Sequence, residues 1–195
     1  MSQSICVINA HPDPGEGHFV SALADAYAQS AEAAGHAVSR IRVADIPLDL
    51  MHSAEEFATP PSEPVRNAQE KIQAADHVVL VFPLWLGMVP ARLKAFIEQV
   101  GRNAFFLDTS GDSNKWPEQK MKGKSARLIV TMGMPGFAYG LIFGGHSLKG
   151  LAQGVFGMSG FKPVRRTVFG GVEAAGDKGR ARMLARIKKW GSQAK

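Results

Sequence analysis

The sequence predicts an α/β protein built on a parallel β-sheet with helices on both of its faces. Apolar, strand-like segments alternate with helical segments about five times along the 195 residues, an order typical of parallel sheets. Residues 77–82 (HVVLVF) form an unbroken apolar run, as expected of a strand that is buried on both faces. With 45% hydrophobic and 21% charged residues, the chain suits one domain, residues 1–195, with a sizeable core.

The first half of the chain has clear breaks between its elements. Residues 37–43 alternate apolar and polar side chains, which predicts a strand near the edge of the sheet. Gly35 is a plausible C-terminal cap for the helix before it. The predicted elements are a strand at 4–9, a loop at 10–17, a helix from His18 to before Gly35, a strand at 37–43, a loop or broken helix at 45–64 and a helix at 65–74.

Two prolines frame the apolar segment at the centre of the chain. Pro83 ends the strand at 77–82, and Pro90 opens a helix that runs to Val100, because proline is tolerated in the first helical turn. Residues 101–124 are expected to be an irregular excursion and not a core element. The remaining predicted elements are a strand at 125–131, a glycine-rich aromatic segment at 132–145, a helix at about 147–156, a strand at 164–169 and a terminal helix.

The composition narrows the classes of partner. The net charge of +6 comes largely from basic residues around Met183, Ile187 and Trp190, whose helical spacing makes those charges the solvated face of an amphipathic helix. No nucleic-acid-binding motif accompanies them, so we expect no nucleic acid as partner. The histidines and the single cysteine show no metal-ligand spacing, and Cys6 is predicted to be a buried core thiol. No segment predicts membrane insertion or a leader, so a cytoplasmic location is expected.

Three unusual loops follow the first, third and fourth strands, and they should therefore meet at the carboxyl edge of the sheet. The first, residues 11–19, offers free N–H groups at a helix start and glycines that allow close approach, which suits a phosphate or another oxyanion. His11 and His18 can add hydrogen bonds to that anion. A plain loop with His18 at a helix start is an equally good interpretation. The spacing is not G-x-G-x-x-G, which counts against a classical dinucleotide fold.

The other two loops suit a planar ring. Residues 83–88 would lay apolar atoms and backbone amides beside it, although such a loop can also be covered by its own domain. Residues 131–139 combine a flexible backbone with a hydroxyl and a phenol. A phosphate site beside two ring-holding loops describes a site for flavin mononucleotide (FMN).

Together the loops resemble the flavodoxin-like NAD(P)H:quinone oxidoreductases, a family that includes quinone reductases and the flavin-binding accessory proteins of potassium-efflux systems. The resemblance covers nearly the whole chain. It rests on residues 11–12 with 18–23, residues 82–85 with 90–94, and residues 128–135 with Tyr139. It implies a flavodoxin-like three-layer sandwich with a five-stranded parallel sheet in the order 2-1-3-4-5, an FMN cofactor, and a homodimer with the flavin near the subunit interface.

The resemblance also implies roles for individual residues. The first loop would bind the flavin phosphate, and the second would lie along the isoalloxazine ring. The third would contact the pyrimidine side of the ring. The implied cofactor-binding residues are, in order, His11, Gly17, His18, Phe19, Val20, Pro83, Leu84, Trp85, Leu86, Gly87, Thr131, Met132, Gly133, Met134 and Tyr139.

Two residues correspond to the catalytic pair of the quinone reductases. Tyr139 matches their tyrosine, and His146 lies one position out of register with their histidine; the alternative for His146 is a histidine at a helix start on the surface. Three positions depart from the family. Its members often carry Ser or Thr, then Phe, then Asn where this chain has His18, Phe19 and Val20, and a second glycine where it has Met134. These departures leave open whether FMN or FAD is retained.

The implied reaction is ping-pong: NADH or NADPH reduces the flavin and leaves, and a quinone or similar flat acceptor then takes the electrons. One alternative is a flavin-binding regulatory subunit that docks on a membrane transporter and has little turnover of its own. Another is a one-electron carrier of the flavodoxin type. Such carriers are typically acidic, so the net charge of +6 disfavours this alternative. The sequence does not choose between NADH and NADPH: Arg165 or Arg166 could meet a 2′-phosphate, but both could equally be surface charges.

Overall fold

The computed structural model describes residues 2–111 and 116–195. Its centre is a five-stranded sheet in which each neighbouring pair of strands is parallel, in the order β2-β1-β3-β6-β7. Because β6 and β7 are the fourth and fifth strands of this sheet, the order is the predicted 2-1-3-4-5. The strand bounds are Ser4–Asn9 for β1, Ala37–Arg42 for β2, His77–Pro83 for β3, Ser125–Met132 for β6 and Val164–Gly170 for β7.

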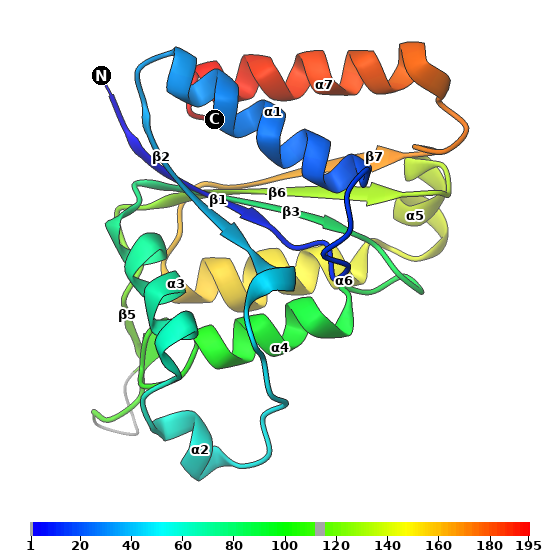
Figure 1. Ribbon diagram of the computed structural model, residues 1–195. Coiled ribbons are helices and arrows are strands. Elements are labelled where there is room, and N and C mark those ends of the chain that lie inside the picture. Colours follow the sequence, from blue (N-terminus) through cyan, green and yellow to red (C-terminus); the bar gives the residue numbers. More distant parts are fainter. Residues whose placement is uncertain (1, 112–115) are drawn as a thin grey trace.

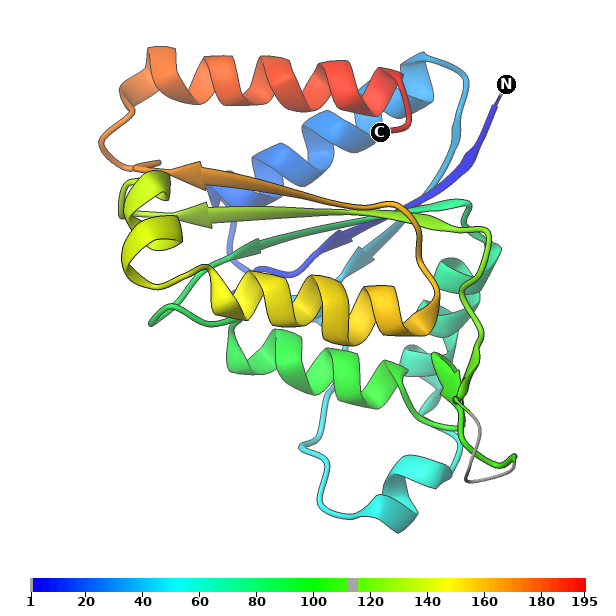
Figure 2. The ribbon, with the colours of Figure 1, turned by 180° about the vertical axis from the view of Figure 1, so that it is seen from behind.

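Helices cover both faces of the sheet, which confirms the predicted three-layer sandwich (Figure 1). One face carries α1 (Phe19–Ala33) and α7 (Gly176–Ser192). The opposite face carries α3 (Glu63–Ala74), α4 (Ala91–Val100) and α6 (His146–Gly150), which continues into a π-helical segment at Leu151–Gly157 (Figure 2). The shorter elements are a 3-10 turn at Val43–Asp45, α2 (Ala54–Ala58), α5 (Gly136–Ile142), and a small antiparallel pair formed by β4 (Leu107–Asp108) and β5 (Glu118–Gln119).

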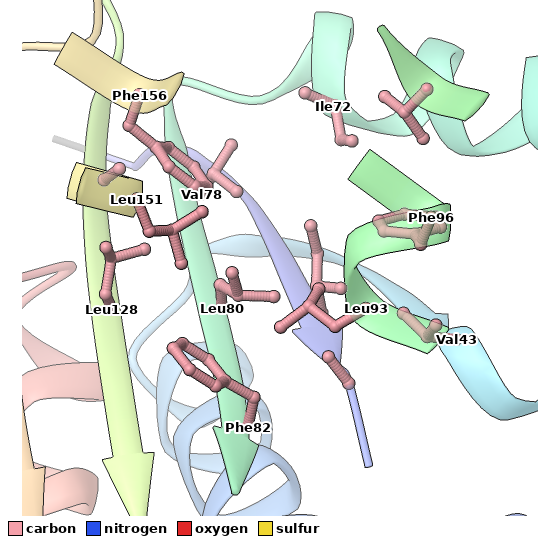
Figure 3. Packing of buried hydrophobic residues seen from close by; sticks show 14 of the residues in the cluster. Val43, Ile72, Val78, Leu80, Phe82, Leu93, Phe96, Leu128, Leu151 and Phe156 are labelled. Atoms are coloured by element: carbon pink, nitrogen blue, oxygen red, sulfur yellow. The ribbon is translucent and has the colours of Figure 1, made fainter. Parts of the chain in front are cut away.

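The buried strand β3 lies at the centre of the core. All seven of its residues are buried, because helices pack on both of its faces. Leu80 and Phe82 point to the face where Leu93 and Phe96 of α4 pack (Figure 3). The helix that follows the second loop is therefore fixed to the strand that precedes it, and the loop between them has two rigid ends.

Two segments differ from the sequence-based expectation. The stretch 101–124 is not simply an excursion: Phe105 and Phe106 pack against the core, and Met121 is fully buried. The polar residues in the middle of this stretch gave no indication of these contacts in the sequence. Residues 112–115, which belong to that middle, lie outside the described residues. The glycine-rich segment 132–145 contains the helix α5, which its low helix propensity concealed.

Other local predictions are confirmed. Cys6 is a free, fully buried thiol, and burial raises its pKa to about 11. The edge strand β2 has a single fully buried residue, Ile41, as its alternating pattern indicates. Within residues 2–111 and 116–195, no helix combines the length and the apolar character that crossing a membrane would require.

Candidate functional site

The loops that follow β1, β3 and β6 meet at one edge of the sheet, as the sequence predicts. The imidazole of His11 lies edge-on to the indole of Trp85, with 6.1 Å between ring centroids, so the first loop touches the second. The Leu84 N–H donates a hydrogen bond to the Thr131 carbonyl oxygen over 2.8 Å, so the second loop is tied to the third. The structure thus assembles a composite surface from segments 120 residues apart in the sequence.

The first loop presents the start of α1 to solvent. His18 is the N-cap residue, but its side chain makes no capping hydrogen bond to the first turn. The first N–H groups of a helix have no intrahelical partner, and the helix dipole favours an anion beside them. Gly17 adopts a φ of 89°, and apart from Gly17 and its two chain neighbours no described residue has an atom within 4 Å of the place where a Cβ would stand. The loop therefore leaves open space beside unpaired donors, as a phosphate requires.

Two histidines stack beside this space. The rings of His11 and His18 lie 3.7 Å apart and 18° from parallel. Nδ1 of His11 lies 3.2 Å from the Asp13 backbone nitrogen, whose N–H can donate to it, and 3.3 Å from the Asp13 carbonyl oxygen, to which it donates in the other tautomer. Burial lowers the pKa of His11, which favours the neutral ring. In either tautomer Nδ1 of His11 faces the Asp13 backbone, which leaves Nε2 for a ligand.

The second loop is an exposed hairpin turn. Trp85 and Met88 exchange backbone hydrogen bonds of 3.0 and 2.9 Å, and the two residues between them, Leu86 and Gly87, have φ values of 49° and 75°. Two consecutive positive φ values are typical of a type I′ turn. Trp85 is 50% exposed and Leu86 is fully exposed. The alternative of a loop covered by its own domain is therefore wrong.

The third loop is held in place by the segment that follows β7. Thr131 and Met132 are buried at the end of β6, and the Met134 carbonyl oxygen accepts a 2.9 Å hydrogen bond from the Gly171 N–H. A Cβ on Gly170 would stand 2.1 Å from the backbone nitrogen of Gly136, so the close approach of β7 and α5 requires glycine there. This packing fixes α5 at the same edge of the sheet as the other loops (Figure 2).

The two predicted catalytic residues occupy different environments. Tyr139 is 2% exposed, and its hydroxyl accepts a 3.4 Å hydrogen bond from the Leu148 N–H, so the phenol lies between α5 and α6. His146 is exposed at the first position of α6, which is where the alternative interpretation puts it. Within the described residues, neither side chain makes a hydrogen bond, an ion pair or an aromatic contact with the first loop, and both catalytic roles stay predictions.

Arg165 and Arg166, suggested for contact with a 2′-phosphate, lie toward the other end of the sheet from the three loops. Arg165 is the second residue of β7 and pairs with Arg127, whereas the three loops follow the other ends of the strands. Five residues of β-strand span about 16 Å. Both arginines thus lie near the start of β7, away from the three loops, and the contact with a 2′-phosphate stays an untested prediction.

The sequence reading missed a hollow beside the first loop. It has a volume of about 490 Å³ and is lined by Gly15, Gly17, Asp25 and Arg42, among others. Nη2 of Arg42 donates a 2.9 Å hydrogen bond to the Pro14 carbonyl oxygen and so holds the loop against the end of β2. The sequence does contain an indication of the basic wall of this hollow, because the alternating pattern at 37–43 puts Arg40 and Arg42 on one face of the edge strand.

Comparisons with known proteins agree with this architecture. A protein-family model described as a flavodoxin-like fold matches residues 3–192. A ribosyldihydronicotinamide dehydrogenase-like protein of Penicillium crustosum is 31% identical over 154 residues, which cover 66% of this chain and 57% of that protein. The chain therefore spans less than two thirds of the length of that relative.

Solved structures with low sequence identity share the fold. An NAD(P)H:quinone oxidoreductase from Methanothermobacter marburgensis superposes with a TM-score of 0.78 at 20% identity, covering 100% of this chain and 98% of that one. An FMN-dependent NADH-azoreductase from Bacillus anthracis, solved in complex with FMN, gives a TM-score of 0.74 at 15% identity, covering 100% and 99%.

Proposed function

This chain belongs to the flavodoxin-like fold family, and on that premise we propose that it is a single-domain, FMN-dependent oxidoreductase. It transfers hydride from NADH or NADPH to a quinone or similar flat acceptor by a ping-pong mechanism. The observation that carries the proposal is the contact at one sheet edge between the first loop, which presents the start of α1, and the half-exposed indole of Trp85. The names of the relative and of the two solved structures support the same class of chemistry.

The residues of the first loop fit a flavin phosphate. His11 offers Nε2, and the backbone from Gly17 to Val20 offers N–H groups beside open space. Val20 is 3% exposed, so its side chain faces the core and only its backbone is available to a ligand. The absence of asparagine at this position therefore removes a side-chain contact but leaves the helix start intact. FMN, when bound, supplies the acceptance and delivery of hydride.

The second and third loops fit the ring. The half-exposed indole of Trp85 offers an apolar surface, and the backbone of residues 131–134 is held rigid by the segment after β7. Rigid backbone amides stabilise a negative charge without reorganising. The side chain of Met134 packs against the core, so it leaves the exposed surface to Gly133. These residues position and desolvate the ring.

We further propose that two copies of the chain associate through this edge. Phe137, Leu141 and Ile142 of α5 are 72%, 82% and 73% exposed, and Leu86 is fully exposed. Monomeric proteins rarely expose large apolar patches. A second copy would cover these side chains and exclude water from the ring site, as expected for a homodimer of a cytoplasmic enzyme.

A second candidate is a flavin-binding regulatory subunit that docks on a membrane transporter. One observation favours it: Tyr139 is only 2% exposed, so its hydroxyl lies inside the protein and not on the surface that a substrate would reach. Negligible turnover with a panel of quinone, azo and nitro acceptors, despite tight FMN binding, would favour this candidate over the enzyme.

The proposal is tested by titrating the purified protein with FMN and then adding NADH or NADPH without oxygen. We expect saturable binding and bleaching of the flavin absorbance; a protein that binds no FMN would refute it. Trp85→Ala should weaken FMN binding about fivefold, since an aromatic stacking contact contributes on the order of 1 kcal/mol.

Trp116→Ala is the matched control, because Trp116 is 73% exposed and lies beyond α4, away from the three loops. Its FMN affinity should equal that of the unmodified protein. If Trp85→Ala leaves both the affinity and the flavin spectrum unchanged, the second loop does not hold the ring.

A further inference from the structure

One acidic side chain lies among the groups that would bind the phosphate. Oδ1 of Asp13 accepts a 2.8 Å hydrogen bond from the Gly15 N–H, and its Oδ2 lies 3.1 Å from Nε2 of His18. The Asp13 backbone nitrogen lies 3.2 Å from Nδ1 of His11. Asp13 thus contacts three other residues of the first loop.

The Asp13 carboxylate is charged and movable. The hydrogen bond from Gly15, with smaller contributions from His18 and His11, holds its pKa below the ordinary value, so it is ionised at neutral pH. Its side chain is 56% exposed. A charged group at the surface can rotate into water at little cost, unlike a buried one.

The contact with His18 is close but imperfect. Nε2 of His18 is buried and has no aligned hydrogen-bond partner among residues 2–111 and 116–195, although the Asp13 carboxylate is within ion-pair distance. A buried nitrogen of this kind gains free energy from a better-placed acceptor. A phosphate oxygen at the start of α1 would be such an acceptor.

We propose that the Asp13 carboxylate is an internal competitor of the flavin phosphate. It accepts the hydrogen bond of the Gly15 N–H and lies within ion-pair distance of His18, and it must move out when a phosphate enters. The inference deepens the proposed function and rests on it. Asp13 thereby lowers the affinity for phosphate groups and keeps the cofactor exchangeable.

Two physical arguments support competition over cooperation. Like charges a few ångströms apart repel, so a phosphate dianion and the Asp13 carboxylate cannot share the same donors. The loop also has an independent anchor, because Arg42 holds the Pro14 carbonyl oxygen. Asp13 can therefore leave without the loop losing its attachment to β2.

The test measures the binding of inorganic phosphate and of FMN to Asp13→Asn. Asparagine keeps an oxygen for Gly15 but removes the charge. At about 10 mM salt, where the Debye length is about 30 Å, both affinities should rise about twofold to fivefold, the range expected for one partly exposed charge. At about 1 M salt the difference should disappear. Asp25→Asn is the matched control, since it removes the same charge from the wall of the adjacent hollow and should change the affinities less.

A double-mutant cycle with His18→Ser locates the competition. If Asp13 competes for His18, the gain from Asp13→Asn should shrink when His18 is absent. Unchanged or weaker phosphate binding by Asp13→Asn at low salt would overturn the inference, and so would a failure of both proteins to bind inorganic phosphate. If Asp13→Asn binds phosphate more tightly but neither protein binds FMN, the proposed function is refuted, whereas the competition between Asp13 and phosphate is supported.

Discussion

His77 should make the fold sensitive to mild acid, although it lies far from the three loops. It begins β3 and is fully buried. Its Nδ1 lies 2.7 Å from the Ser125 hydroxyl, while its Nε2 has no hydrogen-bond partner within the described residues. Burial, with the positive charges of Arg127 and Arg165, lowers the pKa of His77 from its ordinary value of 6.5 to about 4.

The sign of the effect follows from proton binding. Between pH 6.5 and about 4 the unfolded chain protonates His77 and the folded chain does not, so the free energy of unfolding falls as the pH falls. Each pKa unit corresponds to about 1.4 kcal/mol, which gives a total loss of about 3 kcal/mol across this range. Above pH 6.5 the residue contributes no pH dependence.

The assay is urea unfolding of the unmodified protein and of His77→Gln at a series of pH values. Glutamine keeps a hydrogen-bonding group near Ser125 and cannot titrate, so the unfolding free energy of His77→Gln should fall less steeply toward pH 4. His52→Gln, an exposed position, is the control and should reproduce the unmodified slope. Parallel curves for His77→Gln and the unmodified protein would refute the reasoning, as would a folded-state NMR titration of His77 near pH 6.5.

Two further predictions concern the core and the proposed dimer. Leu93→Ala should lower the free energy of unfolding by about 3 kcal/mol, measured in urea, because Leu93 is fully buried against β3. Lys94→Ala on the exposed side of α4 should change it by about 0.5 kcal/mol or less, and equal losses would contradict the packing argument. Replacing Leu141 and Ile142 by Asp should convert a dimer to a monomer in sedimentation velocity. Leu50→Asp, at a 63% exposed position before α2, should leave the dimer intact, and a monomeric unmodified protein would rule the interface out.

The sheet could be predicted because its signals are local. The apolar run at 77–82 predicts a strand that is buried on both faces, and β3 is buried in this way. The alternation at 37–43 predicts a strand that is less buried on one face, as β2 is. Met121 could not be predicted in the same way. It is one apolar side chain in a polar stretch, and only the tertiary path of the chain shows that it is buried.

The site was predictable to the level of loops but not of side-chain contacts. His11, His18 and Trp85 were expected at one edge because parallel strands end together, and the structure places them there. The contacts of Asp13 and Arg42 depend on how the loop turns back on β2, which no periodicity encodes. The burial of Tyr139 likewise follows from α5, a helix that the glycine-rich sequence conceals.

Leu86 connects the local structure to the proposed assembly. It occupies the first central position of a type I′ turn, where Asn or Gly is usual, and its φ of 49° costs roughly 1 kcal/mol for a residue with a Cβ. Its side chain is also fully exposed, so an isolated chain gains no burial in return. Both features are unfavourable in a monomer and become reasonable when a second copy buries the side chain. Because the same turn places Trp85 beside His11, covering Leu86 would also shield the ring site from water, so dimerisation and cofactor binding would stabilise one another.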